Sequence, residues 1–458
     1  MTWNRWYTFK SYIRSALWIT PFFAVVAATL LKRVSEAFGK WAPEHGLWVR
    51  GQAFLNLQPA EAVGYIDRIF TMNLSFLVFT FGSLLVAIQI AGGQYTPRII
   101  ATTLLRDNVI RGISGLFVFT MLWSNRTLAA FTADNVPQFQ VFLTALIGLV
   151  SVVAFLLLID YAARFLRPVN LVARVGEQGL ATIENVYPYP TRDVPAPPMI
   201  AKKRKWSLLS WGSREAAART ASTAKRGPPD RIIYHKGKSG TVLAVNLQAL
   251  VTRAQHADCV IELAPEVGDF LAVDEPLFNL YGNAGGIDDR RLRTLVALGS
   301  ERTMEQDPMF AFRIEVDIAL KALSPAINDP TTAVLAIDQL HRLLRLVGKR
   351  SLRDDEITDS TGQPRVIFHT PDWEDFVHIT FREIRYCGAG SLQIARRLRA
   401  MIENLMQTLP EHRHPALREE LELLDHVLKG AHPIPKDLAL ARIPDSQGLG
   451  GSSRSAHR

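Results

Sequence analysis

The densest group of chemically capable side chains lies between residues 302 and 338, where carboxylates, guanidinium groups and amides alternate with apolar residues. Its members are Arg302, Gln306, Asp307, Arg313, Asp317, Asn328 and Asp329. Side chains of these types could bind a polar ligand or a partner protein if the chain brought them onto one surface. We therefore treat this group as the candidate ligand or partner site.

The same residues have a structural interpretation that stands beside the functional one. Asp307 and Asp329 each precede a proline, and an acid followed by proline is typical of a helix N-cap and the first helical position. Arg313, Asp317 and Lys321 follow one another at intervals of four residues, which places them on one helix face as an ion-pair ladder. Two capped core helices would then explain the pattern without a ligand.

No motif indicates catalysis. Residues 237–239, with the sequence Gly-Lys-Ser, lack the first glycine of a phosphate-binding loop. Cys259 and Cys387 have neither a disulfide-framework nor a zinc-site spacing, and His412 and His414 have no acidic or cysteine ligand at a suitable distance along the chain. We therefore predict no catalytic residue, no cofactor and no metal site.

The elements that must position these residues fall into two unlike halves. The chain has 458 residues and a formal net charge of +9, but charged side chains are sparse before Asp160 and dense after it. The segment from Ile69 to Ala91 carries no charge and is long enough to cross a bilayer as a helix. We predict an α-helical membrane domain over residues 1–168, with four transmembrane helices at about 15–37, 69–91, 112–133 and 138–160.

The distribution of basic residues predicts the orientation of these helices. Lys and Arg gather at the N-terminus, in the loop Arg98–Arg111 and after Arg164, whereas the connection between the third and fourth helices has none. The positive-inside rule places such basic segments in the cytoplasm. We therefore expect both termini in the cytoplasm, although the first exported loop also holds five basic residues.

Three polar side chains, Asn73, Gln89 and Arg126, interrupt the apolar segments. A charged side chain within a membrane helix is costly and normally finds a partner, water or the headgroup region. Arg126 is therefore expected either to reach the exported headgroups as an anchor or to turn inward toward Asn73. Ala87 and Ala91 stand at the spacing that lets membrane helices approach one another.

Two basic segments are predicted to contact lipid headgroups. Arg98 and Arg106 flank a short predicted interfacial helix between the second and third spans, for which a simple turn is the alternative. The second segment consists of Lys202, Lys203, Arg204 and Lys205. It could hold the chain on anionic lipids, and a solvated linker is the alternative. The predicted partners are thus the lipid bilayer and its anionic headgroups, and no nucleic acid is expected.

The second half of the chain is predicted to form a cytoplasmic α+β domain. Residues 169–230 are expected to be a juxtamembrane segment and a proline-rich basic linker, and residues 231–283 a small β-rich module. A turn-rich hairpin in that module resembles those of barrel-sandwich domains. Helical periodicity predicts a helical domain over residues 284–432, followed by a loose tail over residues 433–458.

Four segments carry a resemblance to a known family: Gly93–Arg98, Leu105–Asp107, Arg302–Asp307 and above all Ala322–Ala333. They resemble the bacterial predicted multi-pass membrane proteins called domain of unknown function 2254. The resemblance covers nearly the whole chain, although the linker at residues 194–229 looks longer than is usual in the family. It implies a multi-pass protein of the bacterial inner membrane, and it implies no reaction, cofactor or catalytic residue.

These observations favour a non-enzymatic, oligomeric conduit with a cytoplasmic domain that senses or docks a partner. Four helices in one chain would need further subunits to line a pore, so a homo-oligomer is expected. Two alternatives stay open, namely a membrane-tethered scaffold or sensor without transport, and a membrane-bound enzyme.

Overall fold

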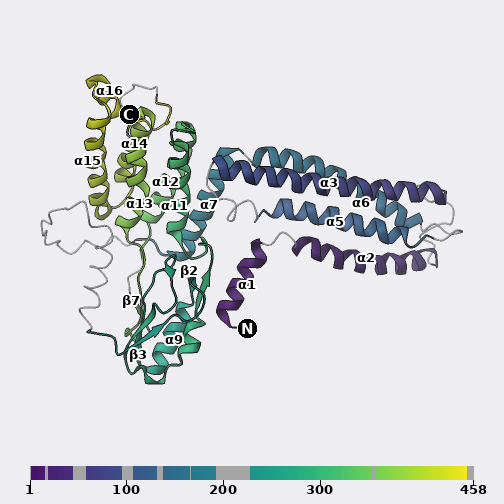
Figure 1. Cartoon of the computed structure of the whole chain (residues 1–458), viewed down its shortest axis with the longest axis horizontal. Coiled ribbons are helices and arrows are strands. Elements are labelled where there is room, and N and C mark those ends of the chain that lie inside the picture. Colours follow the sequence, from purple (N-terminus) through teal and green to yellow (C-terminus); the bar gives the residue numbers. More distant parts are fainter. Residues whose placement is uncertain are drawn as a thin grey trace. The chain divides into compact units, whose positions relative to one another are not determined.

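The computed structural model describes residues 2–15, 19–44, 58–94, 107–131, 138–165, 167–191, 227–352 and 356–450. They form two compact units, drawn in Figure 1. Following the sequence prediction, we call Ser11–Leu171 the membrane unit, and we call Met1–Lys10 together with Val172–Arg458 the soluble unit. The predicted lipid-contact residues Arg98 and Arg106, and the basic cluster at 202–205, lie outside the described residues.

Four helices run side by side in the membrane unit (Figure 1). They are α2 (Ile19–Glu44), α3 (Pro59–Gln94), α5 (Asn108–Leu128) and α6 (Gln138–Phe165). Helix α5 packs against each of the other three and is therefore the central helix of the unit.

Only two of these helices are long and apolar enough to cross a membrane by their own composition. They are Pro59–Ile90 within α3 and Phe139–Arg164 within α6. Lys32 and Arg33 stand near the middle of α2, and α5 has 21 residues with Arg126 in its last turn. The prediction of four membrane helices is therefore not confirmed, because charges shorten the apolar length of α2 and α5.

Helix α7 (Pro168–Val186) occupies the predicted juxtamembrane segment. Two glycines allow it to approach the soluble helices closely. A Cβ built on Gly176 would lie 2.4 Å from Oε1 of Gln339, and one on Gly179 would lie 2.8 Å from the Cβ of Ala311. A larger side chain at either glycine would therefore push α7 away from its neighbours.

Two β-sheets form one part of the soluble unit. The five-stranded sheet has the order β1 (Arg231–Tyr234), β5 (Pro276–Gly282), β3 (Cys259–Leu263), β8 (Pro364–Phe368) and β7 (Glu356–Thr358). Only β3 and β8 pair in parallel. The three-stranded antiparallel sheet has the order β4 (Phe270–Leu271), β2 (Gly240–Val245) and β6 (Val296–Gly299). Apolar residues of both sheets share one core with α9 (Leu247–Ala257).

This arrangement corrects the predicted boundary between a β-rich module at 231–283 and a helical domain at 284–432. Strands β6, β7 and β8 come from the predicted helical region, and β3 pairs with β8 about a hundred residues further along the chain. The likeness to a barrel-sandwich hairpin is not found, because the strands join sheets whose partners are distant in sequence.

Six helices form the other part of the soluble unit. They are α11 (Pro308–Ala322), α12 (Pro330–Gly348), α13 (Trp373–Gly388), α14 (Leu392–Thr408), α15 (His414–Ala431) and α16 (Pro435–Ala441). Helix α11 packs against α12 and α13, and α14 packs against α12 and α15. The apolar residues of α11 face these neighbours and are almost completely buried.

The segment after residue 433 differs from the loose tail expected from the sequence. Arg396 on α14 is fully buried, and it donates hydrogen bonds to the carbonyl oxygens of Ile443 at 3.0 Å and Gly450 at 2.8 Å. Asp445 is 2% exposed and accepts a hydrogen bond from the backbone N–H of Gly450 at 2.7 Å. The tail is held because a buried guanidinium group needs acceptors.

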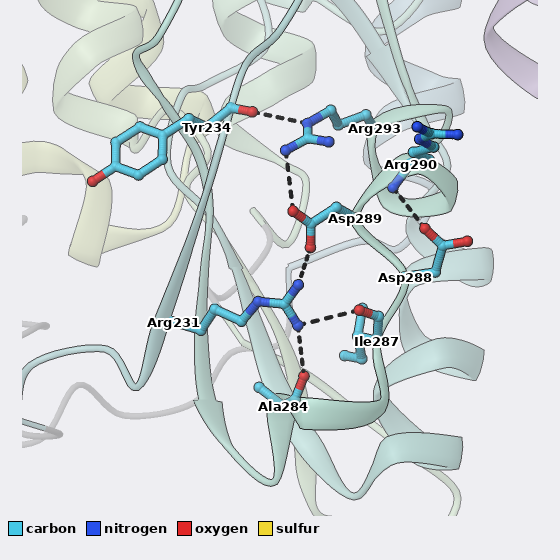
Figure 2. A network of polar contacts seen from close by, with 8 residues as sticks. All are labelled: Arg231, Tyr234, Ala284, Ile287, Asp288, Asp289, Arg290 and Arg293. Carbon is cyan, nitrogen blue, oxygen red and sulfur yellow. Dashed lines mark hydrogen bonds and ion pairs between the residues drawn. The ribbon is translucent and has the colours of Figure 1, made fainter.

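A polar network ties β1 to the segment that leads into β6 (Figure 2). Arg231 pairs with Asp289 of α10 (Asp289–Arg293) and donates hydrogen bonds to two backbone carbonyls of the preceding turn. Arg293 binds the second oxygen of Asp289 at 3.2 Å and the carbonyl of Tyr234 at 2.9 Å. One carboxylate shared by two arginines thus fixes the chain that precedes the candidate site.

Candidate functional site

The first three residues of the predicted site anchor the start of α11. Asp307 is 3% exposed, accepts a hydrogen bond from the backbone N–H of Phe310 at 3.1 Å and pairs with Arg302. Burial raises the pKa of Asp307, and Arg302 opposes that shift. Gln306 accepts a hydrogen bond from the N–H of Val245 at 3.0 Å, which ties the segment to β2. These contacts are those of a capped helix attached to a sheet.

The middle of α11 carries an ion-pair cluster that extends beyond the predicted ladder. Arg313 donates to Asp317 at 2.7 Å and forms a bidentate pair with Glu383 of α13, at 2.8 and 3.0 Å. The Glu383 pairing is the largest cause of a raised pKa for Arg313. The cluster therefore joins two helices, and Glu383 is a partner that helical spacing alone could not reveal.

Asn328 and Asp329 form the turn between α11 and α12. Asn328 is exposed and adopts a φ of +49°, a left-handed conformation that asparagine tolerates better than most residues. Asp329 caps α12 by accepting hydrogen bonds from the backbone N–H of Thr332 at 3.1 Å and from its hydroxyl group. Both residues are accounted for by the geometry of this turn.

The seven predicted residues thus fall into three groups along α11. A helix of 15 residues is about 22 Å long at ~1.5 Å per residue, and the first and last groups lie beyond its opposite ends. The structure brings together Arg302, Gln306 and Asp307, and separately Arg313 and Asp317, but it does not bring all seven onto one surface. Among the described residues, no three His, Cys, Asp or Glu side chains are grouped as metal ligands.

Sequence reasoning missed Glu315, which lies on the same helix. Its side chain is 0% exposed, and neither carboxylate oxygen has a hydrogen-bond partner in the described structure. Burial alone raises the pKa of Glu315 well above its usual value. Glu315 follows Ala311 by one turn, so it faces the side of α11 on which α7 packs. Its burial without a hydrogen-bond partner, rather than any motif, marks it as unusual.

The interior of the membrane unit holds a second group of polar side chains, which we call the polar file. Its members are at most 7% exposed and are Asn73, Thr80, Ser114, Thr120, Ser124, Thr127, Gln140, Thr144 and Ser151. They come from α3, α5 and α6. The sequence analysis singled out only Asn73, because hydroxyl groups are common in membrane helices and give little signal on their own.

Two contacts fix the register of α3 against α6. Near one end, a Cβ built on Gly148 would lie 3.1 Å from a methyl carbon of Ile69. Further along, the rings of Phe76 and Phe155 stack with their centroids 4.0 Å apart. The two helices therefore run parallel, and Asn73 lies between the two contacts.

Ser151 lies between the same two contacts on α6, and so at the level of Asn73. Its hydroxyl oxygen is 2.9 Å from that of Thr120 on α5. All three side chains are fully buried. They form one polar layer across the centre of the bundle.

A further polar layer lies toward the C-terminal end of α5. Nε1 of Trp123 donates a hydrogen bond to Thr144 at 2.9 Å, and the hydroxyl of Thr144 lies 3.4 Å from that of Thr127. Thr144 also donates to the backbone carbonyl of Gln140 at 2.7 Å. The polar file thus continues along α6 for about three turns from Gln140 to Ser151, at 3.6 residues per turn.

Aromatic rings interrupt the polar file on the other side of the central layer. Phe76 lies 5.6 Å from Phe117, and Phe117 lies 6.4 Å from Phe155, measured between ring centroids. Phe117 is completely buried. Ser114, one turn earlier on α5, is therefore separated from Thr120 by packed aromatic rings.

The three polar residues predicted within the membrane helices have different environments. Asn73 is fully buried, whereas Gln89 is exposed on the outside of α3. Arg126 is half-buried, and its Nη1 atom is covered by protein. It lies six residues beyond Thr120, or about 9 Å along α5, so it does not share a layer with Asn73.

Replacement of Glu315 by glutamine tests the burial of an unpaired carboxyl group. The pKa of Glu315 is raised in the folded protein, so the folded state favours the protonated side chain. This contribution to stability is fully present below pH 4.5 and is lost as the pH rises above that value. We expect Glu315→Gln to melt progressively higher than the wild-type protein between pH 5 and 8, by several degrees at pH 8. A difference in melting temperature that did not change with pH would contradict this assignment.

Replacement of Asp329 by alanine tests the helix cap. Loss of the acceptor for Thr332 should lower the free energy of unfolding by about 1 kcal/mol, measured by denaturant titration of the purified protein. Asn328→Gly is the matched control, because glycine adopts a φ of +49° without strain and should change stability by only a few tenths of that amount. Equal stability of Asp329→Ala and the wild type would leave a ligand-binding role as the better explanation.

Comparison with known proteins relates the chain to predicted membrane proteins. The family described as "Predicted membrane protein (DUF2254)" matches residues 14–404. An uncharacterised protein of Mycobacterium bovis and one of Mycobacterium tuberculosis are each 22% identical over 433 residues, covering 92% of this chain and 78% of the relative. No solved structure matches. The chain belongs to the DUF2254 family of predicted membrane proteins.

Proposed function

We propose that this protein is a multi-pass protein of the bacterial inner membrane that conducts protons or a small polar solute along the polar file. In this proposal α2, α3, α5 and α6 all cross the bilayer, both termini lie in the cytoplasm, and the soluble unit docks or senses a partner there. The aromatic cluster of Phe76, Phe117 and Phe155 is the constriction that closes the path at rest.

One observation supports the function of a conduit more strongly than that of a passive scaffold. Several polar atoms in the membrane unit are buried and have no hydrogen-bond partner among the described residues. They include Oδ1 of Asn73, Oγ of Ser114, Oγ of Ser124 and Nη1 of Arg126. An unpaired polar group in a hydrocarbon environment costs several kcal/mol, so such groups are expected to meet water or a passing solute.

The outer surfaces of the same helices suit a lipid environment or further copies of the chain. On α6, Leu149, Val153, Leu156 and Leu157 are between 49% and 62% exposed. A soluble protein rarely leaves so many large apolar side chains in contact with water. We propose that lipid and neighbouring subunits cover them, and a homo-oligomer would place several conduits side by side.

Proton flux into liposomes that contain the purified protein and a trapped pH-sensitive dye tests the proposal. Phe117→Ala opens the aromatic constriction and should raise the flux about tenfold, whereas Thr120→Val removes a hydroxyl of the central layer and should lower it by a similar factor. Leu85→Ala is the matched control, because Leu85 is 62% exposed on the outside of α3 and its variant should behave like the wild type.

The same assay with potassium, chloride and small neutral solutes extends the test to other cargo. If Phe117→Ala gave no flux of any of them above protein-free liposomes, the conduit would be rejected. The membrane-tethered scaffold or sensor would then be the better explanation of the polar interior.

Substitutions of Arg126 test independently whether this side chain belongs to the polar file or anchors the helix at the membrane surface. If its guanidinium group points into the bundle, Arg126→Leu should reduce flux or assembly, and Arg126→Lys should restore only part of it because lysine cannot reproduce the planar donor array. Size-exclusion chromatography and the liposome assay measure both effects. Full activity of the leucine variant would instead identify Arg126 as an anchor in the exported headgroup region.

A further inference from the structure

One face of the N-terminal helix α1 (Trp3–Ser15) is docked on the soluble unit. The ring of Tyr7 is buried in a small apolar cluster with residues of β2 and β6, and Trp3 packs against the same cluster. The two rings stack with their centroids 5.4 Å apart. The backbone N–H of Asn4 donates to the carbonyl of Thr294 at 3.2 Å, so the first turn of α1 is fixed to the sheet.

The opposite side of α1 is exposed and unlike an ordinary water-facing surface. Trp6 is 48% exposed and Phe9 is 52% exposed. The Nζ atom of Lys10 lies 4.9 Å from the centre of the Trp6 ring, and Arg5 is exposed as well. The helix contains no acidic residue. Large aromatic rings and basic groups therefore alternate on one surface without negative charge.

Helix α1 directly precedes a predicted membrane helix in the sequence. Residues 16–18 alone separate α1 from α2, which begins at Ile19. In the proposed four-span arrangement, on which this step rests, α2 enters the bilayer from the cytoplasmic side. The exposed side of α1 is then held within a few residues of the lipid headgroups.

We infer that the exposed face of α1 binds the anionic surface of the cytoplasmic leaflet. Trp6 and Phe9 enter the headgroup region, where amphipathic aromatic rings are preferred, and Arg5 and Lys10 bind lipid phosphates or carboxylates. A lipid surface fits better than an acidic protein, because α1 directly precedes a predicted membrane helix in the sequence and exposes aromatic rings beside its basic groups. The soluble unit is thereby attached to the bilayer through the docked face of the same helix.

Quenching of a probe by spin-labelled lipid tests this inference on the full-length protein in nanodiscs. Phe9→Cys and Thr8→Cys are each combined with Cys387→Ser and labelled with bimane, and the buried Cys259 is spared under native conditions. Thr8 is exposed and lies about 160° around the helix from Trp6, so its variant is the matched control. In nanodiscs containing phosphatidylserine and a headgroup nitroxide, the Phe9 probe should be quenched about twice as strongly as the Thr8 probe.

A charge-reversed variant tests the contribution of the basic side chains. Arg5→Glu combined with Lys10→Glu should reduce quenching of the Phe9 probe in discs with phosphatidylserine, and should change it little in discs of phosphatidylcholine alone. Unaltered melting temperatures show that the labelled variants are folded. Equal quenching of the Phe9 and Thr8 probes would overturn the inference.

A third probe separates failure of this inference from failure of the four-span arrangement. Phe23 on α2 is 64% exposed, and a bimane at Phe23→Cys should be quenched by nitroxides in the upper part of the acyl chains. If the Phe23 probe is quenched and the Phe9 probe is not, α1 does not bind lipid although α2 spans the membrane. If the Phe9 probe alone is quenched, α1 binds lipid and the four-span arrangement is wrong.

Discussion

The burial of most of α11 is the constraint on which the helical part of the soluble unit depends. Its residues Phe312, Ile314, Val316 and Ile318 are at most 1% exposed, because α7, α12 and α13 cover it. A helix with so little surface in contact with water must satisfy most of its polar groups internally. The N-cap, the Arg313 cluster and the turn into α12 all meet this demand. The residues that the sequence marks as a candidate site therefore also make the contacts that allow α11 to pack. Glu315 is the exception, because it is buried on α11 and has no hydrogen-bond partner in the described structure.

Helix α5 plays the corresponding part in the membrane unit, but its polar groups are satisfied differently. The hydroxyl groups of Thr120 and Thr127 donate to carbonyl oxygens one turn earlier on their own helix, at 2.8 and 2.9 Å. Such local bonds remove the cost of a buried donor without requiring a partner helix. They leave the oxygen lone pairs free to accept from elsewhere, as the contact between Thr120 and Ser151 illustrates. A bundle of this kind can contain polar groups in its centre although hydrogen bonds between its helices are not what stabilises it.

Local chemistry made part of this architecture predictable. Length and the scarcity of charge identified the segments that became α2, α3, α5 and α6, and an acid before proline identified the caps at Asp307 and Asp329. The short strands β6 to β8 could not be found in the same way, because a strand of three to five residues gains its stability from partners far along the chain. The pairing of Arg313 with Glu383 and the isolation of Glu315 also arise only when helices pack. For the same reason, the local sequence pattern could not predict whether the seven residues of the candidate site lie on one surface.

The docking of α1 on β2 and β6 has a consequence for the order in which the protein is made. The first ten residues leave the ribosome long before Leu243, Ala244 and Ala297, with which Trp3 and Tyr7 pack. Throughout the synthesis of the membrane unit, α1 has no folded partner, and its aromatic residues must be shielded by the lipid surface or by a chaperone. Completion of the second sheet is then the event that recruits α1. A fusion placed at the N-terminus would delay or block a late step of assembly, while leaving membrane insertion unaffected.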